Sequence, residues 1–361
     1  MNLPTRRGWG WWSEVKLQIL REYLHSFTTA VRGRSSEAIY LDLFAGSYDN
    51  PRRHEAGSFP GSTRIALENE PQFTRLAFFE LPGPAMALET AIRQARPTDQ
   101  CWRVFAGDCN ETLSEALLWL DPIRWAPTYA FLDPRGLQVA WQTVEQLATW
   151  RADKKTKVEQ WILLPEPALA RVLGLSGAIG RRMAERLDRL FGVRDWAAIH
   201  KLRQEGEISP EEERAEFVNL LRWRLEKALA YKTTHALQLV NTAGQPVYTM
   251  VFATDSSPGD KIMSHVYNSA STRTIPTTQE RARAARERRA EQASGILRLP
   301  GIEVIPAAVK RVGKTYDHLP PWEPPPLADE VLELRDEGEV DLDDIDLEKW
   351  AEDLEGPEGG Q

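Results

Sequence analysis

The sequence contains few of the residues that mark disulfide-linked, metal-binding or membrane-spanning proteins. Among 361 residues there are two cysteines, Cys101 and Cys109, whose eight-residue separation matches no common zinc-ligand spacing. The six histidines are scattered, so we predict no metal site. No apolar run approaches the roughly 18 residues of a membrane span, and the first residues lack the apolar stretch of a secretory signal. We therefore expect a cytoplasmic protein with reduced thiols and no membrane segment.

The charge of the chain is unevenly distributed. Hydrophobic residues make up 42% and charged residues 27%, which excludes a wholly disordered or collagen-like chain. After Pro326, 15 acidic residues accompany two basic ones for a net charge of −13, whereas the preceding chain has 43 basic and 38 acidic residues, a net of +5. We expect a mildly basic body and an acidic tail that either solubilises the chain as a disordered segment or folds on a basic partner surface.

Short apolar runs rich in β-formers alternate with amphipathic stretches from residue 38 onward. This alternation predicts a parallel, doubly wound sheet. The expected strands are residues 38–44, 76–80, 102–107, 128–133 and 158–164, and the expected helices between them are 83–95, 110–120 and 142–150. A helix over 13–27 precedes the first strand, and strands over 237–241 and 247–253 flank a turn with Gly244 that favours an antiparallel hairpin.

Five parallel strands followed by an antiparallel hairpin is the order of a class I methyltransferase sheet. We predict an α/β fold of this Rossmann-like type, with a C-terminal antiparallel hairpin and a helical insertion at about residues 168–234. This methyltransferase-like domain is expected to cover residues 1–272. A basic helix and C-terminal extension follow at 273–322, with Thr277 and Glu280 as a capping box. The proline linker and acidic tail, 323–361, are expected to be disordered.

An acidic residue lies at or near the end of each of the first four strands. Because ligands of such sheets bind outside the carboxyl ends of the strands, we predict an S-adenosylmethionine site there. Glu80 would accept hydrogen bonds from the ribose and Asp108 one from the adenine amine, while Gly46 lets the backbone pass close to the methionine part. The alternative is that each acid is an N-cap or turn residue. The predicted cofactor-binding residues are Asp42, Phe44, Ala45, Gly46, Glu80 and Asp108.

A nicotinamide-dependent enzyme is the main competing interpretation of this pattern. Such an enzyme would carry G-x-G-x-x-G in the first turn, to seat a pyrophosphate at a helix N-terminus. The loop here has Gly46 and no second glycine until Gly57. A ligand without a pyrophosphate therefore fits better. The sequence also has no Walker A motif and no serine nucleophile elbow.

The fourth strand ends in Asp133-Pro134-Arg135-Gly136, where amino-methyltransferases carry an Asp or Asn, two prolines and an aromatic residue. In that arrangement the acidic side chain and a proline carbonyl accept hydrogen bonds from an exocyclic amine, so that its lone pair can attack the sulfonium methyl. We predict Asp133, Pro134 and Arg135 as the catalytic residues. The alternative is an Asp-Pro turn without a catalytic role.

Arg135 stands where the second proline is expected, so it is a candidate to stack on a base or hold a phosphate. Tyr48 or Trp141 would then supply the aromatic platform for the base. Lys16 and Trp12, on the first helix, are candidates to reach over the site. The alternative for these two is a solvated lysine beside a core tryptophan.

Several motifs in combination resemble the three-Cys-motif partner proteins, over roughly residues 10–270. They are Trp12-Ser13 with Lys16-Leu17, Tyr40-Leu41-Asp42-Leu43-Phe44-Ala45-Gly46, Gly61-Ser62 before Ile65-Ala66-Leu67, Phe79-Glu80, Gly107-Asp108, Phe131-Leu132-Asp133-Pro134-Arg135-Gly136, and Val251-Phe252-Ala253-Thr254 with Gly259, Ile262 and Met263. The resemblance implies a methyltransferase-type fold. It also implies a partner protein with a three-cysteine motif that looks like a radical S-adenosylmethionine enzyme. The chain departs from the family's pattern at residues 47–50, where the family has a second glycine and a proline, and at Arg135, where it has an aromatic residue.

We predict S-adenosylmethionine-dependent methyl transfer to a nucleic acid, working with the three-Cys-motif protein. The alternative is a non-catalytic adaptor of that partner which keeps the methyltransferase fold. An open, polar mouth around Asp133 favours catalysis, and a filled mouth favours the adaptor. The helix with Arg281, Arg283, Arg286, Arg288 and Arg289 is a candidate phosphate-contacting element. A solvated, salt-bridged face is its alternative.

Overall fold

The structure, a computed structural model, describes residues 8–53, 56–173, 179–241, 244–294, 316–325 and 334–335. Its strands form one large sheet and two small ones. The large sheet contains β1 (Ile39–Asp42), β4 (Arg75–Glu80), β5 (Trp102–Ala106), β6 (Thr128–Leu132), β7 (Glu159–Leu164), β9 (Thr233–Val240), β10 (Pro246–Thr254) and β11 (Tyr316–Asp317). The small sheets pair β2 (Asp49–Pro51) with β3 (Ser58–Pro60), and β8 (Ile179–Gly180) with β12 (Leu334–Arg335).

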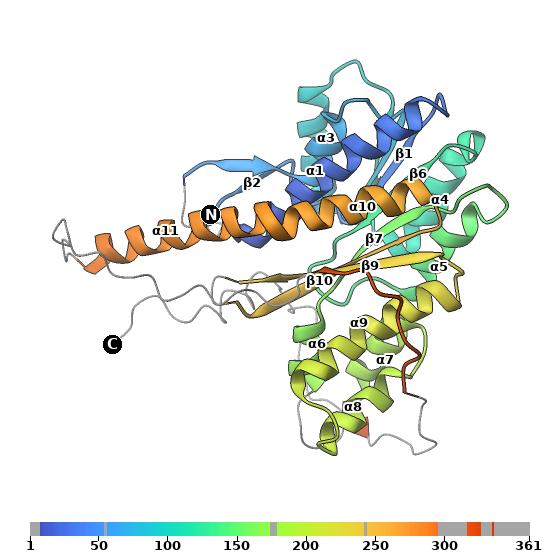
Figure 1. Cartoon of the computed structure of the whole chain (residues 1–361). Coiled ribbons are helices and arrows are strands. Elements are labelled where there is room, and N and C mark those ends of the chain that lie inside the picture. The colour runs from blue at the N-terminus through green and yellow to red at the C-terminus, as the bar shows by residue number, and fades with distance from the viewer. Residues whose placement is uncertain are drawn as a thin grey trace.

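The eight strands of the large sheet lie in the order β11-β9-β10-β7-β6-β1-β4-β5 (Figure 1). The five strands β7, β6, β1, β4 and β5 are parallel to one another, and β10 is inserted antiparallel between β7 and β9. This arrangement confirms the predicted Rossmann-like α/β fold with a C-terminal antiparallel strand pair. Because β1 lies between β4 and β6, the winding of the chain reverses at β1, and the carboxyl end of β1 is the switch point of the sheet.

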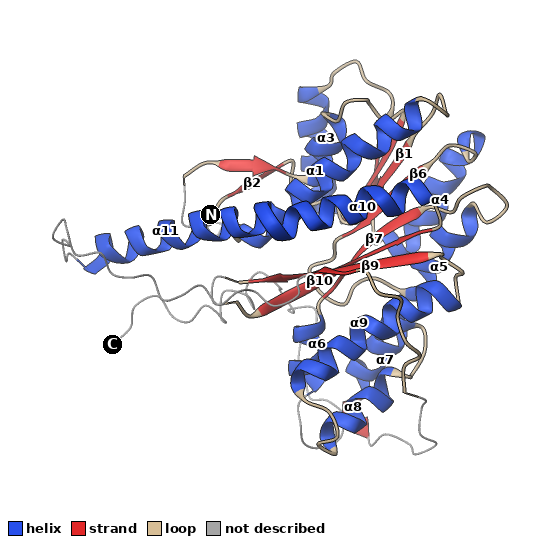
Figure 2. Cartoon of the chain, viewed as in Figure 1, coloured by secondary structure: helices blue, strands red, loops and turns tan. Residues whose placement is uncertain are grey.

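Helices cover both faces of this sheet (Figure 2). On one face lie α1 (Trp11–Arg32), α2 (Ser62–Leu67), α3 (Pro82–Ala95), α10 (Ser257–Ser269) and α11 (Ile275–Ser294), and on the other α4 (Cys109–Leu120), α5 (Trp141–Trp150), α6 (Glu166–Leu173), α7 (Arg181–Phe191), α8 (Trp196–Gln204) and α9 (Pro210–Lys227). Alternate residues of β1 enter different cores, with Tyr40 on the α1 side and Ile39 and Leu41 on the α4 side. Double coverage explains why these strands are continuous apolar runs in the sequence.

The basic helix does not begin at a capping box, so that prediction is wrong. α10 continues through a π-helical turn, Ala270–Thr274, directly into α11, and Thr277 therefore lies inside a helix. Ala270 and Ile275 are both buried in the core on the α1 side. Burial of these side chains holds the junction helical, where a separate helix would need a capped start.

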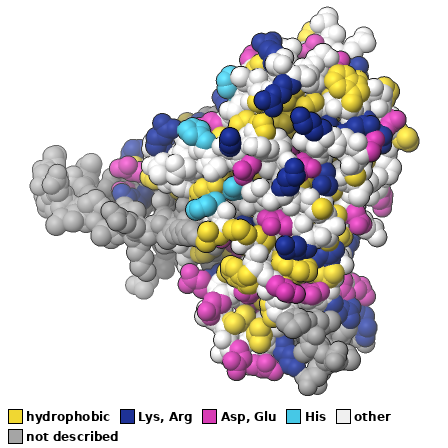
Figure 3. All heavy atoms as spheres, turned by 45° about the vertical axis from the view of Figure 1, so that its right-hand side comes forward, with side chains coloured by type: hydrophobic (Ala, Val, Ile, Leu, Met, Phe, Trp, Pro, Cys, Tyr) yellow, Lys and Arg dark blue, Asp and Glu magenta, His cyan; other side chains and the backbone are white. Residues whose placement is uncertain are grey.

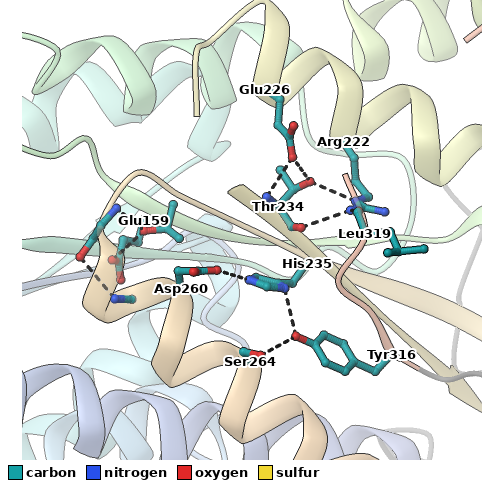
Figure 4. Close-up of polar contacts among 12 residues, drawn as sticks. Glu159, Arg222, Glu226, Thr234, His235, Asp260, Ser264, Tyr316 and Leu319 are labelled. Atoms are coloured by element: carbon teal, nitrogen blue, oxygen red, sulfur yellow. Dashed lines mark hydrogen bonds and ion pairs between the residues drawn. The ribbon is translucent and has the colours of Figure 1, made fainter. Parts of the chain in front are cut away.

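A short C-terminal segment covers the outer edge of the hairpin (Figure 4). β11 pairs antiparallel with β9, and the Tyr316 hydroxyl lies 3.1 Å from His235 Nδ1 and 2.9 Å from Ser264 Oγ. His235 Nε2 lies 2.6 Å from a carboxylate oxygen of Asp260. The Arg222 guanidinium donates to Asp317 at 3.3 Å. Without β11, β9 would be the edge strand of the sheet and would expose unpaired backbone groups. β11 pairs with these groups and covers them.

Glu166, the first residue of α6, is a fully buried acid. Its Oε1 accepts hydrogen bonds from Thr249 at 2.7 Å and Gln238 at 3.3 Å, and its Oε2 has no hydrogen-bond partner among the described residues. Burial raises the pKa of Glu166 to about 7, against the opposing effect of the Thr249 hydroxyl. The folded state therefore holds this proton more tightly than the unfolded state does, and folding stability declines as pH rises towards 7.

We expect Glu166→Gln to stabilise the protein at high pH and to leave it nearly unchanged at low pH. The amide keeps the acceptor for Thr249 and removes the buried charge, so the gain in free energy of unfolding should grow between pH 4.5 and 7 to about 3 kcal/mol. Urea unfolding at pH 5 and pH 8 measures the difference, with Glu89→Gln on the exposed side of α3 as the control. An equal effect of Glu166→Gln at both pH values would contradict this assignment.

Candidate functional site

The carboxyl ends of four parallel strands bring most of the predicted site residues to one edge of the sheet. Asp42 pairs in register with Phe78 of β4 and Phe131 of β6. Backbone bonds continue past the strand ends, since Ala45 N–H donates to the carbonyl of Phe79 at 3.0 Å and Gly107 N–H to that of Glu80 at 2.9 Å. The loops after β1, β4 and β5 are therefore fixed to one another at the switch point.

Glu80 connects the loop after β1 to the end of β4. Its Oε2 accepts from Gly46 N–H at 2.7 Å, and its Oε1 accepts from Leu81 N–H at 2.9 Å. Gly46 has a φ of +62°, a left-handed conformation that strains other residues. Each carboxylate oxygen has a second lone pair, so Glu80 can still accept from a ligand. The half-buried Phe44 and buried Ala45 lie in the same loop.

Asp42, the last residue of β1, is a fully buried acid with one unsatisfied oxygen. Tyr40 donates to its Oδ2 at 3.1 Å, and its Oδ1 has no hydrogen-bond partner among the described residues. Burial raises the pKa of Asp42 to about 7, Tyr40 and Ser62 oppose the rise, and the nearby Asp133 adds to it. A buried acceptor without a donor costs about 1–3 kcal/mol, so a ligand amino group at this edge would relieve a real deficit. The carboxylate acceptors of Asp42 and Glu80 therefore suit a ligand that donates hydrogen bonds.

Asp108 is the N-cap of α4, as the structural alternative expected. Its Oδ1 accepts from the backbone N–H of Asn110 at 2.9 Å and from the Asn110 side-chain amide at 2.7 Å. Its Oδ2 lies 3.8 Å from Arg189 of α7, and 41% of the Asp108 side chain is exposed. The capping role uses one oxygen and leaves the other facing solvent and Arg189.

An ion pair joins the first helix to the end of β6. Lys16 Nζ lies 2.6 Å from Asp133 Oδ1, and the side chains are only 6% and 19% exposed. The ammonium also lies 5.0 Å from the centroid of the Tyr248 ring. Trp12, by contrast, is 1% exposed and belongs to the core. The sequence contains one indication of this ion pair. Lys16 lies at helical spacing between the apolar residues Trp12, Leu20 and Tyr23, so it falls on the buried face of the helix, where a lysine needs a partner.

Arg135 lies against an aromatic residue that the sequence did not single out. The guanidinium of this exposed side chain is 5.7 Å from the centroid of the Trp9 ring and has no hydrogen-bond or ion-pair partner among the described residues. Pro134, between Asp133 and Arg135, is buried. No regular pattern surrounds Trp9, so only its tertiary contacts place it beside Arg135.

Trp141 cannot be the aromatic platform, and that alternative is wrong. Its side chain is 5% exposed, and the guanidinium of Arg224 covers its ring at 4.1 Å from the centroid. Gly192 packs against it so closely that an added Cβ would lie 2.4 Å from the indole. As the first residue of α5, Trp141 points into the core on the α4 side. Tyr48 remains half-buried, with Arg64 over its ring at 5.8 Å.

Within the described ranges, no group of three or more His, Cys, Asp or Glu residues is placed to hold a metal ion. None of the described helices has the length and apolar character needed to cross a bilayer. On the face seen in Figure 3, basic and acidic side chains are interspersed with no single continuous basic patch. An anionic ligand on that face would therefore be bound by individual basic side chains and not by a broad positive surface.

Comparison with known proteins adds little to this geometry. No protein-family model matches the chain, and no curated protein matches it. Among solved structures, a crystal structure of protein LPL1258 from Legionella pneumophila str. Philadelphia 1, described under the family model DUF519, aligns with a TM-score of 0.41 and 9% identity over 71% of this chain and 91% of that one. A similarity of this degree assigns no function. The resemblance to the three-Cys-motif partner family is tested by none of these comparisons and stays a prediction.

The turn between β3 and α2 depends on glycine at position 61. Gly61 N–H donates to the carbonyl of Tyr48 at 2.8 Å, and an added Cβ would lie 2.0 Å from the carbonyl oxygen of Ser47. The β2–β3 hairpin is thereby held against the loop after β1. We expect Gly61→Ala to lower the free energy of unfolding by about 1–3 kcal/mol, because backbone must move to admit the methyl group. Gly33→Ala, where nothing lies within 4 Å, is the matched control in thermal melting, and equal melting temperatures for the two variants would refute this explanation.

Proposed function

We propose that this chain binds S-adenosylmethionine at the carboxyl edge of its sheet and transfers a methyl group to a nucleic acid, in concert with a three-Cys-motif protein. The observation that supports the proposal most is the convergence of Asp42, the Gly46–Glu80 contact, Asp108 and Asp133 at adjacent strand ends around the switch point. These groups come from four different strands.

Each acid has a specific task in cofactor binding. Glu80 would accept from the ribose hydroxyls with its remaining lone pairs, and Asp42 Oδ1 would accept from the amino group of the methionine part. Asp108 Oδ2, which the capping bonds leave available, would accept from the adenine amine. Bound S-adenosylmethionine supplies an electrophilic methyl group. Phe44, Ala45 and Gly46 shape the loop along which the methionine part would lie.

Asp133 is the residue that would orient the attacking group. Its Oδ1 is held by Lys16, while no described residue donates a hydrogen bond to its Oδ2. That oxygen is therefore available to a substrate amine, and Lys16 fixes the direction in which it points. Pro134 extends the following chain, so that its carbonyl is available as a second acceptor. Orientation of this kind accelerates transfer because the lone pair is aligned before reaction.

One observation favours the adaptor alternative. The Lys16 ammonium already occupies one Asp133 oxygen at 2.6 Å, where a substrate donor would otherwise bind. In an adaptor this ion pair would be a permanent connection between α1 and β6. The two functions therefore differ in whether Asp133 accepts a substrate hydrogen bond beside Lys16.

We expect saturable binding of S-adenosylmethionine or S-adenosylhomocysteine that Glu80→Ala weakens by about 10- to 150-fold, since a hydrogen bond to a charged acceptor contributes about 1.5–3 kcal/mol. Titration calorimetry measures the affinity. Glu89→Ala is the matched control, because Glu89 is a partly exposed acid on α3 paired with Arg93. Absence of heat at millimolar ligand would rule out the cofactor assignment.

We expect Asp133→Ala to reduce methyl transfer by about 100-fold or more while leaving cofactor affinity within a few-fold. Asp133→Asn should fall between, because the amide oxygen still orients a donor but cannot take up a proton. Incorporation of tritiated methyl groups into total RNA and DNA from cells lacking the protein measures the activity. Full activity of the Ala variant would make Asp133 a turn residue. If the wild type modifies nothing, even with its three-Cys-motif partner present, the adaptor becomes the better explanation.

A further inference from the structure

A connected group of basic and aromatic side chains lies next to Asp133. The backbone of Trp9 pairs with the chain at the end of β2, since its N–H donates to the carbonyl of Pro51 at 2.8 Å and its carbonyl accepts from Arg53 N–H at 3.0 Å. The Arg135 guanidinium lies over the Trp9 ring, 5.7 Å from its centroid, and the Trp9 side chain stays partly exposed. The N-terminal segment, the hairpin and the loop after β6 therefore meet at one place.

Arginine side chains from several elements join this contact network. Arg53 lies over the Trp12 ring at 5.5 Å. Arg52 and Arg281 both bind Glu14, at 2.9 Å and 3.2 Å, which joins the hairpin and α11 to α1. Its basic side chains include Lys16, Arg52, Arg53, Arg135 and Arg281, and the acids Glu14 and Asp133 form ion pairs with three of them.

The hydrogen bonds from Arg52 and Arg281 keep the pKa of Glu14 below its ordinary value, although burial opposes them. Glu14 therefore stays charged and holds both arginines in place. Both arginines are thereby fixed to α1, the helix that also carries Lys16.

We propose that this network, which we call the Trp9–Arg135 surface, binds a single-stranded nucleic acid. Two features favour this ligand over an acidic peptide. A planar indole and a planar guanidinium, both partly exposed, can stack on bases without regard to sequence. The arginines of the network suit the phosphate backbone that follows the stacked base, and the Arg135 guanidinium forms no hydrogen bond or ion pair with a described residue. An acidic peptide would use the charge but would gain little from Trp9.

The stacked arrangement of Trp9 and Arg135 also indicates that the nucleic acid is single-stranded. A base can stack on Trp9 or Arg135 only when it is free of its own helical neighbours, which a duplex does not allow without extrusion. The inference deepens the proposed function, because it names the substrate class of the Asp133 edge. It can fail independently, since binding of a nucleic acid is measured without S-adenosylmethionine.

The test is fluorescence anisotropy of the full chain with labelled oligo(dT) and oligo(U) of about 12 nucleotides, beside a duplex of equal length. At about 50 mM salt we expect the single strands to bind more tightly than the duplex, with affinity falling steeply as salt rises. Trp9→Ala should weaken binding by about 5- to 150-fold and Trp9→Phe by less. Arg135→Ala should weaken it and reduce the salt slope by about one.

Arg103→Ala is the matched control, because Arg103 lies 5.0 Å over the Trp119 ring, near the start of β5 and away from the carboxyl edge. Its affinity should equal that of the wild type. Thermal melting of each variant separates lost binding from lost folding. If Trp9→Ala has a lowered melting temperature, Arg135→Ala still tests the proposal, because Arg135 is exposed and its substitution should not disturb the fold. The proposal is overturned by absent binding, by equal loss in Arg103→Ala, or by duplex or polyglutamate binding as tightly as the single strands.

Discussion

The ion pair between Lys16 and Asp133 is the interaction on which the arrangement of the candidate site depends. A lysine that is 6% exposed must be paired, because an isolated buried ammonium is costly. The pair joins α1, which precedes the sheet, to the end of its fourth parallel strand. The direction of Asp133 is thus set by a residue 117 positions earlier in the chain.

The same helix organises the surface around the site through Glu14. The two arginines that bind it come from the β2–β3 hairpin and from α11, so three segments far apart in the sequence converge on one carboxylate. Buried acids elsewhere in the fold, Glu159 and Glu166, have pKa values raised by burial to about 7. The protein therefore carries several buried carboxyl groups that are partly protonated near neutral pH.

The amino-acid sequence predicts the structure best where the signal is local. Apolar runs predicted β4 to within one residue of its observed start, and the turn with Gly244 predicted the pairing of β9 with β10. The capping box predicted at Thr277 is wrong because the burial of Ile275, which the local motif does not reveal, keeps the helix continuous. Trp141 differs from its predicted role for a similar reason, since nothing in the sequence shows that Arg224 and Gly192 enclose it.

The sequence by itself determined the α/β class, the antiparallel hairpin after the parallel strands and the row of acids at the strand ends, because hydrophobic period and the succession of elements are written along the chain. Only the tertiary structure decided which groups meet those acids. Lys16 at Asp133, Gly46 at Glu80 and Trp9 under Arg135 are contacts between distant segments. Such contacts depend on how helices and loops pack across the sheet, and packing is a property of the whole fold that no local pattern encodes.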